Sequence, residues 1–248
     1  VLLDTGWRTG VLLGAIVSST DAAAVFSTLR VLGLPARLTA TLEMESGFND
    51  APVIILVIML SSGATGSPVE LVALITYQLL AGAVIGLAVA FGAAWLLRRG
   101  ALPVAGLYPL SILAVSVGSY AVATVAHASG FLAAYLTGLV LGNVHLPHRH
   151  ATVGFVEGLA WLAQIGLFVL LGLLVTPSRL GPAVLAAVGF GAVLLLLARP
   201  LSVVASAVWF RVRWAEQVFV SWAGLRGAVP IVLTTIPLTA GAPEARRI

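Results

Sequence analysis

Three carboxylates, Glu43, Glu45 and Asp50, lie in the stretch Thr39 to Pro52, which leads directly into the apolar run Val53 to Leu60. Because a surface helix does not need so apolar a second half, we predict that residues 39–61 form one membrane span. An acid at the centre of a span costs about 2.5–3.5 kcal/mol on insertion scales, so such a residue marks a functional site by default.

The spacing of these polar residues places them on two faces of the predicted helix. Glu43, Ser46 and Asp50 share one face, and Glu45 and Asn49 form an i, i+4 pair on the neighbouring face. In a water-poor cavity a carboxylate such as Asp50 favours its protonated form, whereas a nearby cation favours its charged form. One carboxylate can therefore hold a proton or a metal ion, and competition between the two is the chemistry of ion exchange.

The composition requires a membrane for these elements. The chain has 248 residues, of which 60% are hydrophobic and 9% charged, and its mean hydropathy is +1.10. Soluble domains carry about 25% charged residues. The absence of Cys excludes disulfides and thiolate metal sites, and we expect no cofactor. The chain begins at Val1 and ends after Arg246-Arg247-Ile248, so we expect it to be a piece of a longer protein.

Eight segments are apolar enough to cross about 30 Å of hydrocarbon. They are residues 10–30, 39–61, 70–97, 103–127, 130–145, 151–175, 181–209 and 215–238. With eight spans, the loops on one side hold Arg30, Arg37, Arg98, Arg99, Arg149, Arg211 and Arg213. The other side holds Arg8, Arg179, Arg246 and Arg247. Seven against four predicts that the first side is cytoplasmic.

Two of these spans carry polar or helix-breaking residues at mid-depth. Ser18-Ser-Thr-Asp21 places four polar residues in succession in the first span, and Ala223-Gly-Leu-Arg-Gly-Ala-Val-Pro230 interrupts the eighth. Short polar side chains compete with the helix for backbone hydrogen bonds. Two interrupted helices that run in opposite directions are typical of secondary transporters with a site near the bilayer midplane.

The middle spans lack ionisable residues at mid-depth, so we interpret them as a scaffold or dimerisation layer. Close helix contact is allowed by the pairs Gly82 and Gly86, Gly138 and Gly142, and Gly154 and Gly158.

The charges inside spans need partners. Arg199 has no acid in its own span, and a paired buried charge costs far less than a lone one, so we predict that it pairs with an acid from another span. We interpret Glu45 as a structural member of an ion pair rather than a direct cation ligand. Arg226 would offset the negative ends of interrupted helices. Asp21 should lie near Asp50, although either acid could instead be a buried structural carboxylate. Glu43 could reach the interface.

Three histidines, His145, His148 and His150, lie in one predicted loop. With no acid or thiol beside them, we interpret them as solvated loop residues rather than a metal or pH-sensing site.

Four motifs in this order resemble the monovalent cation:proton antiporter-1 family. Ser19-Thr-Asp-Ala-Ala-Ala-Val-Phe26 resembles its Thr-Asp unwound helix, and Glu45-Ser-Gly-Phe-Asn-Asp50 resembles its Glu-Ser-x-x-Asn-Asp signature. Ala198-Arg199 and Gly224-Leu-Arg-Gly-Ala-Val229 resemble its two late arginine motifs. The residues of the first motif are most similar to those of the potassium/proton antiporter branch.

The resemblance implies an all-α transmembrane fold, a polytopic helical bundle with inverted repeats and two interrupted, crossing helices. It also implies a homodimer in the inner (cell) membrane. Residues 1–61 and 178–248 would form an ion-binding core, 62–102 a linker helix, and 103–177 scaffold or dimerisation helices.

The same resemblance assigns roles to the site. Asp50 would be the titrating carboxylate that binds the transported K⁺ or Na⁺, with Asp21, Ser46 and Thr20 around it. Asn49 would mark the electroneutral type of exchanger, and Glu45 would pair with Arg199. Many relatives have Pro where this chain has Ala22, so the first helix must break for other reasons.

Two other classes of protein remain as alternatives. An intramembrane aspartyl protease could use Asp21 and Asp50 as a dyad that shares a proton, but it would leave Arg199 and Arg226 without a role. A cation channel, or a structural membrane module with buried ion pairs, is the other alternative. Paired interrupted helices favour the exchanger over the channel.

Overall fold

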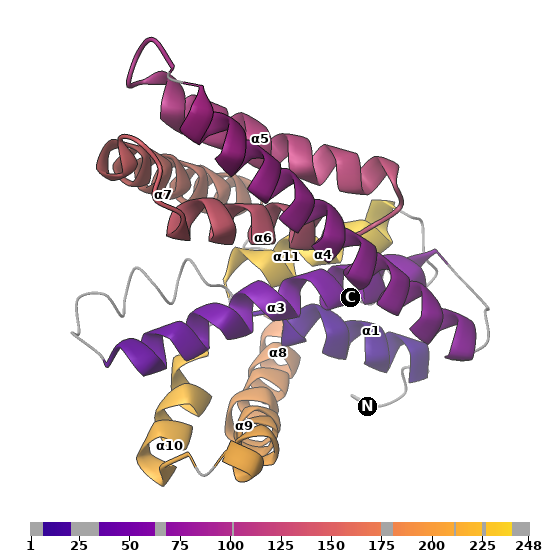
Figure 1. Ribbon diagram of the computed structural model, residues 1–248. Helices are drawn as coiled ribbons and strands as arrows, with labels where there is room; N and C mark the ends of the chain where they lie inside the picture. Colours follow the sequence, from indigo (N-terminus) through magenta and orange to yellow (C-terminus); the bar gives the residue numbers. More distant parts are fainter. Residues whose placement is uncertain are drawn as a thin grey trace. The chain divides into compact units, whose positions relative to one another are not determined.

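The chain folds into helices throughout the part that its computed structural model describes, which comprises residues 7–20, 35–62, 68–100, 102–174, 181–210, 212–224 and 227–239. No strand occurs in these ranges (Figure 1), so the predicted all-α class is confirmed. The helices are α1 (Trp7–Ser18), α3 (Ala36–Ser61), α4 (Pro68–Arg99), α5 (Leu107–Val125), α6 (Gly130–Asn143), α7 (Arg149–Leu174), α8 (Gly181–Val193), η3 (Leu194–Ala198), α9 (Arg199–Ala207), η4 (Val208–Phe210), α10 (Trp214–Ala223) and α11 (Ala228–Thr239).

Five helical stretches are long and apolar enough to cross a membrane. They are Arg37–Ser61, Val72–Arg99, Leu107–Val125, Arg149–Leu173 and Ala187–Phe210. Three shorter apolar helices, Thr9–Ser18, Gly130–Asn143 and Val229–Thr239, lie in the predicted first, fifth and eighth spans. The total of eight spans remains a prediction.

The chain divides into two compact units. Unit 1 contains Val1–Asn49 and Leu167–Ile248, and unit 2 contains Asp50–Gly166. The boundaries lie inside α3 and α7, each of which is one continuous helix. The predicted assignment of core and scaffold roles remains a prediction.

In unit 2, α6 packs closely on α4. A Cβ added at Gly82 would lie 2.7 Å from the backbone oxygen of Ser129, and one added at Gly86 would lie 2.6 Å from that of Ala133. Thr137 on α6 is fully buried, and its hydroxyl lies 3.1 Å from the Gly86 carbonyl oxygen. The predicted close contact at Gly82 and Gly86 is confirmed, and only Gly tolerates it.

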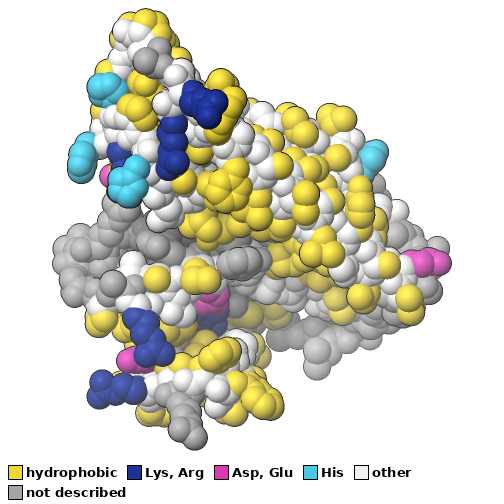
Figure 2. Space-filling view, in the orientation of Figure 1, with side chains coloured by type: hydrophobic (Ala, Val, Ile, Leu, Met, Phe, Trp, Pro, Cys, Tyr) yellow, Lys and Arg dark blue, Asp and Glu magenta, His cyan; other side chains and the backbone are white. Residues whose placement is uncertain are grey.

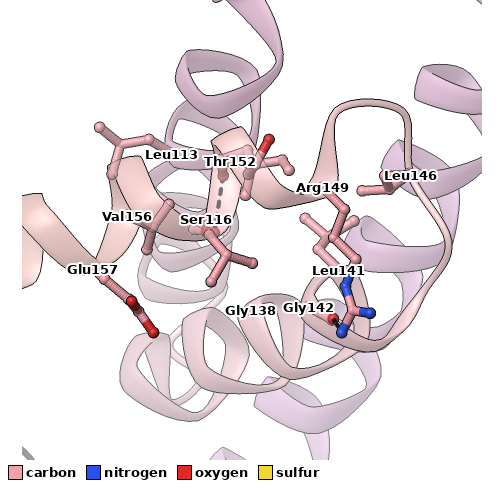
Figure 3. A pocket seen from close by; sticks show the side chains of 12 residues that line it. Leu113, Ser116, Gly138, Leu141, Gly142, Leu146, Arg149, Thr152, Val156 and Glu157 are labelled. Atoms are coloured by element: carbon pink, nitrogen blue, oxygen red, sulfur yellow. Dashed lines mark hydrogen bonds between the residues drawn. The ribbon is translucent and has the colours of Figure 1, made fainter.

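The other two glycine pairs show no such close backbone approach to another helix in the described part of the chain. An added Cβ at Gly138, Gly142, Gly154 or Gly158 would meet no atom within 4 Å. Gly138 and Gly142 instead line a cavity of about 280 Å³ between α5, α6 and α7 (Figure 3). Arg149 lies at one end of this cavity and donates a hydrogen bond to the Gly142 carbonyl oxygen at 2.9 Å.

In unit 1, an apolar cluster joins α3, α9 and α10. Its buried members are Leu42, Val203, Val220 and Ala223, with Leu38 and Phe219 packed against them. α1 contacts α11, the second half of the interrupted last helix. The core of unit 1 therefore holds α3 against α9 and α10. Polar residues of these helices and of the segment after α1 form the candidate site.

Candidate functional site

α1 stops where the sequence places the polar residues of the first predicted span. α1 ends at Ser18, whose hydroxyl donates to the Ala15 carbonyl at 2.7 Å, and Ser19 and Thr20 follow in non-helical backbone. Both are buried, with 0% and 2% of their surface exposed. α1 thus ends within the stretch where the sequence predicts an unwound midpoint, and the remainder of that span, Asp21 included, lies outside the described residues.

Thr20 joins the end of α1 to α3 through its hydroxyl. Its Oγ1 lies 3.1 Å from Ser46 Oγ and accepts a hydrogen bond of 2.7 Å from Asn49 Nδ2. Ser46 is 2% exposed. The amide oxygen of Asn49 is buried and has no hydrogen-bond partner among the described residues. An unused buried acceptor is costly in a folded protein, so this oxygen is available to a bound species.

Asp50 follows Asn49 on α3 and is partly buried. It lies four residues after Ser46 on a continuous helix, so the two side chains occupy neighbouring positions on one face. The hydroxyls, the amide and the carboxylate thus come from α3 and from the two residues that follow α1. The predicted partner Asp21 and the side chain of Glu43 fall outside what the structure describes.

Glu45 and Asn49 are one turn apart on α3 but bind different partners. Arg199 binds the Glu45 carboxylate with both terminal nitrogens, Nη1 to Oε1 and Nη2 to Oε2, the second at 2.9 Å. The Arg199 side chain is 8% exposed and the Glu45 side chain is 29% exposed. A two-pronged pair of this kind is the strongest form of guanidinium–carboxylate contact.

Arg199 also contacts the interruption in the last predicted span. Its Nη2 lies 3.3 Å from the Val220 carbonyl oxygen, one of the last carbonyls of α10, which ends at Ala223. An added Cβ at the next residue, Gly224, would overlap the Arg199 guanidinium group. The helix resumes at Ala228, so the predicted interruption is confirmed. A cation at the C-terminal end of a helix is electrostatically favourable.

A π-helical turn, Leu194–Ala198, precedes Arg199. The Arg199 N–H bonds the Leu194 carbonyl, five residues earlier rather than four, and the following Pro200 has no N–H to donate. A π-turn widens the helix and changes the direction of the residues after it. This turn therefore sets the direction in which Arg199 leaves the helix.

Sequence reasoning missed Gly224, the Val220 carbonyl and the π-turn as parts of this site. It assigned the dipole-compensating role to Arg226, which lies outside the described residues, whereas Arg199 occupies such a place at the end of α10. The signal for the π-turn was present as Pro200 directly after a charged residue inside an apolar span. Among the described residues, no group of three or more His, Asp or Glu side chains is arranged to hold a metal ion.

A family model described as "Sodium/hydrogen exchanger, transmembrane" matches residues 1–247. The K(+)/H(+) antiporter NhaP of Alkalimonas amylolytica is 44% identical over 252 residues, covering 98% of this chain and 43% of its own length. The K(+)/H(+) antiporter NhaP2 of Shewanella oneidensis is 41% identical over 256 residues, covering 99% and 44%. The chain thus spans less than half the length of these relatives.

The fold also matches a solved structure. The sodium proton antiporter MjNhaP1 from Methanocaldococcus jannaschii, determined at pH 8, superimposes with a TM-score of 0.81. The match covers 99% of this chain and 64% of that one at 23% identity, so it supports the fold. The apolar helices and the family model together indicate a multi-pass membrane protein. The resemblance found in the four motifs is confirmed, and the chain belongs to the sodium/hydrogen exchanger family of transmembrane proteins.

Proposed function

We propose that the protein is a secondary active transporter that exchanges a monovalent cation, K⁺ or Na⁺, for H⁺. The observation that carries this proposal is the buried group of oxygens on Thr20, Ser46 and Asn49, with Asp50 as the next residue of α3. Oxygen atoms in a dry site can replace part of the hydration shell of a monovalent cation. Family membership supports the proposal, as do relatives named as potassium/proton antiporters.

In this mechanism Asp50 is the group that both ions share. A proton neutralises its carboxylate, and a cation pairs with the charged form, so binding of one disfavours the other. The hydroxyls of Thr20 and Ser46 and the amide oxygen of Asn49 would complete the cation site, with Asp21 as a second carboxylate. Asn49 carries no charge and would not bind a further proton, so Asp50 would exchange one cation for one proton, which is electroneutral.

Glu45 and Arg199 have a structural role in this proposal. Their pairing compensates both charges, so neither competes with Asp50 for the transported ion. Arg226 would offset helix-end dipoles at the interruption between α10 and α11. Residues 1–61 and 178–248 would move as a core relative to the scaffold of 103–177, with 62–102 as the linker, and expose the site alternately to each side.

The setting of the full protein is part of the same proposal. We infer that it works as a homodimer in the inner (cell) membrane and needs no cofactor. K⁺ is the first candidate for the transported ion because the relatives at 41–44% identity are named potassium/proton antiporters. Na⁺ is the second, since a "Probable Na(+)/H(+) antiporter 2" of Methanocaldococcus jannaschii is 29% identical over 269 residues, covering 93% of this chain and 58% of its own length.

The test is dequenching of a pH dye in proteoliposomes of the full-length protein, titrated with K⁺, Na⁺ and Li⁺. We expect cation-dependent proton flux in the wild type and none in Asp50→Asn. Glu70→Gln, which changes an exposed acid at the start of α4, is the matched control and should keep wild-type flux. Normal flux in a folded Asp50→Asn protein would remove Asp50 from the mechanism.

The same assay separates the alternative functions. A channel would pass cations down their gradient without stoichiometric proton counterflow, and a protease would do neither. No finding on the fold, the site or the relatives supports either alternative.

A further inference from the structure

The cytoplasmic end predicted for α4 carries two neighbouring arginines and a tryptophan. Arg98 and Arg99 form its last turn and are exposed. The Arg99 guanidinium lies 4.7 Å from the centroid of the Trp95 ring, one turn earlier. This cation–π contact holds one arginine against the helix surface and leaves its N–H groups available for a ligand.

A surface hollow of about 480 Å³ lies beside these residues. It is lined by Phe91, Ala94, Trp95, Arg98, Arg99 and Val144, which we call the α4-end hollow. Its apolar residues come from α4 and from the loop after α6, and its two charged residues belong to the final turn of α4. The hollow therefore combines an apolar wall, which suits an acyl chain, with two guanidinium groups at the helix end.

The surroundings of the hollow are basic. The same end of unit 2 carries Arg149 at the start of α7 and the histidine loop, where the His148 ring lies 5.3 Å from that of Tyr108. Arg and His side chains gather in the upper left of Figure 2, among hydrophobic ones. Within the described ranges, no carboxylate forms an ion pair with Arg98 or Arg99.

Two simpler explanations account for only part of this arrangement. Arginines in the last turn compensate the α4 dipole, and they fit the excess of positive charge expected on the cytoplasmic side. Neither explanation requires an apolar hollow beside both guanidinium groups or an arginine fixed on a tryptophan. A ligand with a negative head and an apolar tail would use the guanidinium groups and the apolar hollow together.

We propose that the α4-end hollow binds an acidic phospholipid of the surrounding bilayer. Arg98 and Arg99 donate hydrogen bonds to the lipid phosphate, a geometry that the guanidinium group suits. The acyl chain lies along Phe91 and Ala94, and the Trp95 ring anchors the interfacial region between them. Basic residues close to a membrane surface attract acidic lipids. This proposal does not depend on the transport function.

The test uses the full-length protein, purified in detergent and freed of lipid, with dioleoyl phosphatidylglycerol and dioleoyl phosphatidylcholine as probes. Bound lipid is counted by native mass spectrometry, and stabilisation is read from thermal melting. We expect the wild type to prefer phosphatidylglycerol by roughly thirtyfold, as two basic residues near an acidic lipid would give. Arg98→Gln/Arg99→Gln should lose this preference, and Trp95→Ala should weaken it.

Three controls make the outcome decisive. Arg213→Gln removes another exposed arginine and should keep the preference, so an equal loss there would overturn the proposal in favour of unspecific surface charge. Full preference in Arg98→Gln/Arg99→Gln would also overturn it. Glycerol 3-phosphate should not displace the lipid at equal concentration, and displacement would indicate a simple anion site. Arg98→Lys/Arg99→Lys covers the case of poor folding and should retain part of the preference.

Discussion

Arg199 donates hydrogen bonds to two different helices, since its terminal nitrogens contact the Glu45 carboxylate on α3 and the Val220 carbonyl on α10. Its Nε is buried and has no partner among the described residues. Desolvation of such a charge is offset only when its pairing is good. Arg199 therefore has more contacts to lose than Glu45 does.

The first prediction concerns this pair. Removing one partner of a buried ion pair costs about 3–5 kcal/mol. Glu45 is 29% exposed, so we expect the cost of Glu45→Gln to lie at the lower end of this range. Arg199→Ala should cost more because it also removes the hydrogen bond to the Val220 carbonyl. Replacing both residues with apolar ones should restore much of the stability. The measurement is a double-mutant cycle on unfolding in an SDS titration, and simple additivity of the two single losses would contradict the contact.

The second prediction concerns Gly224, whose missing side chain makes room for the Arg199 guanidinium. Gly224→Ala should displace Arg199 and lower both stability and transport, whereas in an Arg199→Ala background the same change should cost little. Gly191→Ala in α8 is the matched control, since a Cβ there meets no atom within 4 Å. An equal cost of Gly224→Ala in both backgrounds would mean that Arg199 is not the reason for the glycine.

Single residues of the site differ in how far the sequence could predict them. The need of Arg199 for an acid from another span could be predicted because its own span has none, and the family resemblance identified Glu45 as that acid. Thr20, Ser46 and Asn49 were expected to lie near Asp50, but their contacts with one another were not predicted. The contact at Gly224 could not be predicted, because it depends on the path of the chain between α9 and α10 and on the π-turn before Arg199.

At the scale of elements, the clearest feature is that helices stop where polar residues or glycines replace apolar ones. α1 ends at Ser18 and α10 at Ala223. Both ends could be predicted, because short polar side chains and glycines weaken the helix locally. The helix boundaries were less accurate, and α5 starts at Leu107 rather than near residue 103. A close helix contact at Gly82 and Gly86 was predicted as one of three such possibilities, but α6 as the partner of α4 was not, because spacing alone does not reveal which helix lies opposite.

The third prediction tests that pairing. Gly86→Ala would place a Cβ 2.6 Å from the Ala133 carbonyl oxygen and 2.7 Å from its Cα. Because backbone atoms cannot give way cheaply, α4 and α6 must separate, at an expected cost of about 1–3 kcal/mol. Gly138→Ala faces the open cavity and should be neutral or stabilise by up to about 1 kcal/mol. SDS-titration unfolding compares the two variants, and equal effects would contradict the close approach.

At the scale of the whole molecule, the contacts of unit 1 join segments from both ends of the chain. Glu45 on α3 binds Arg199 on α9, and Leu42 packs with Val203 and Val220. Thr20, at the end of α1, binds Asn49 on α3. Such ties suit a part of a transporter that moves as one piece, as the proposed mechanism requires. The division into units could not be predicted in detail, since its boundaries lie within continuous helices.

The fourth prediction concerns competition at Asp50, the central claim of the proposed mechanism. If one carboxylate holds either a proton or the cation, the apparent KM for the cation should rise as pH falls. At pH values where the carboxylate is mostly protonated, the KM should rise about tenfold for each unit by which the pH falls, as one-to-one competition requires. The maximal rate at saturating cation should change much less than the KM.

The most direct measurement is the apparent KM for K⁺ and for Na⁺ as a function of pH, from dye dequenching in proteoliposomes of the full-length wild type. The mechanism predicts a KM that falls steadily as pH rises through the titration of the site and then levels off. Asp50→Asn should show no cation-dependent flux at any pH, and Glu70→Gln should follow the wild-type curve. A KM independent of pH, or flux retained in Asp50→Asn, would contradict a shared carboxylate.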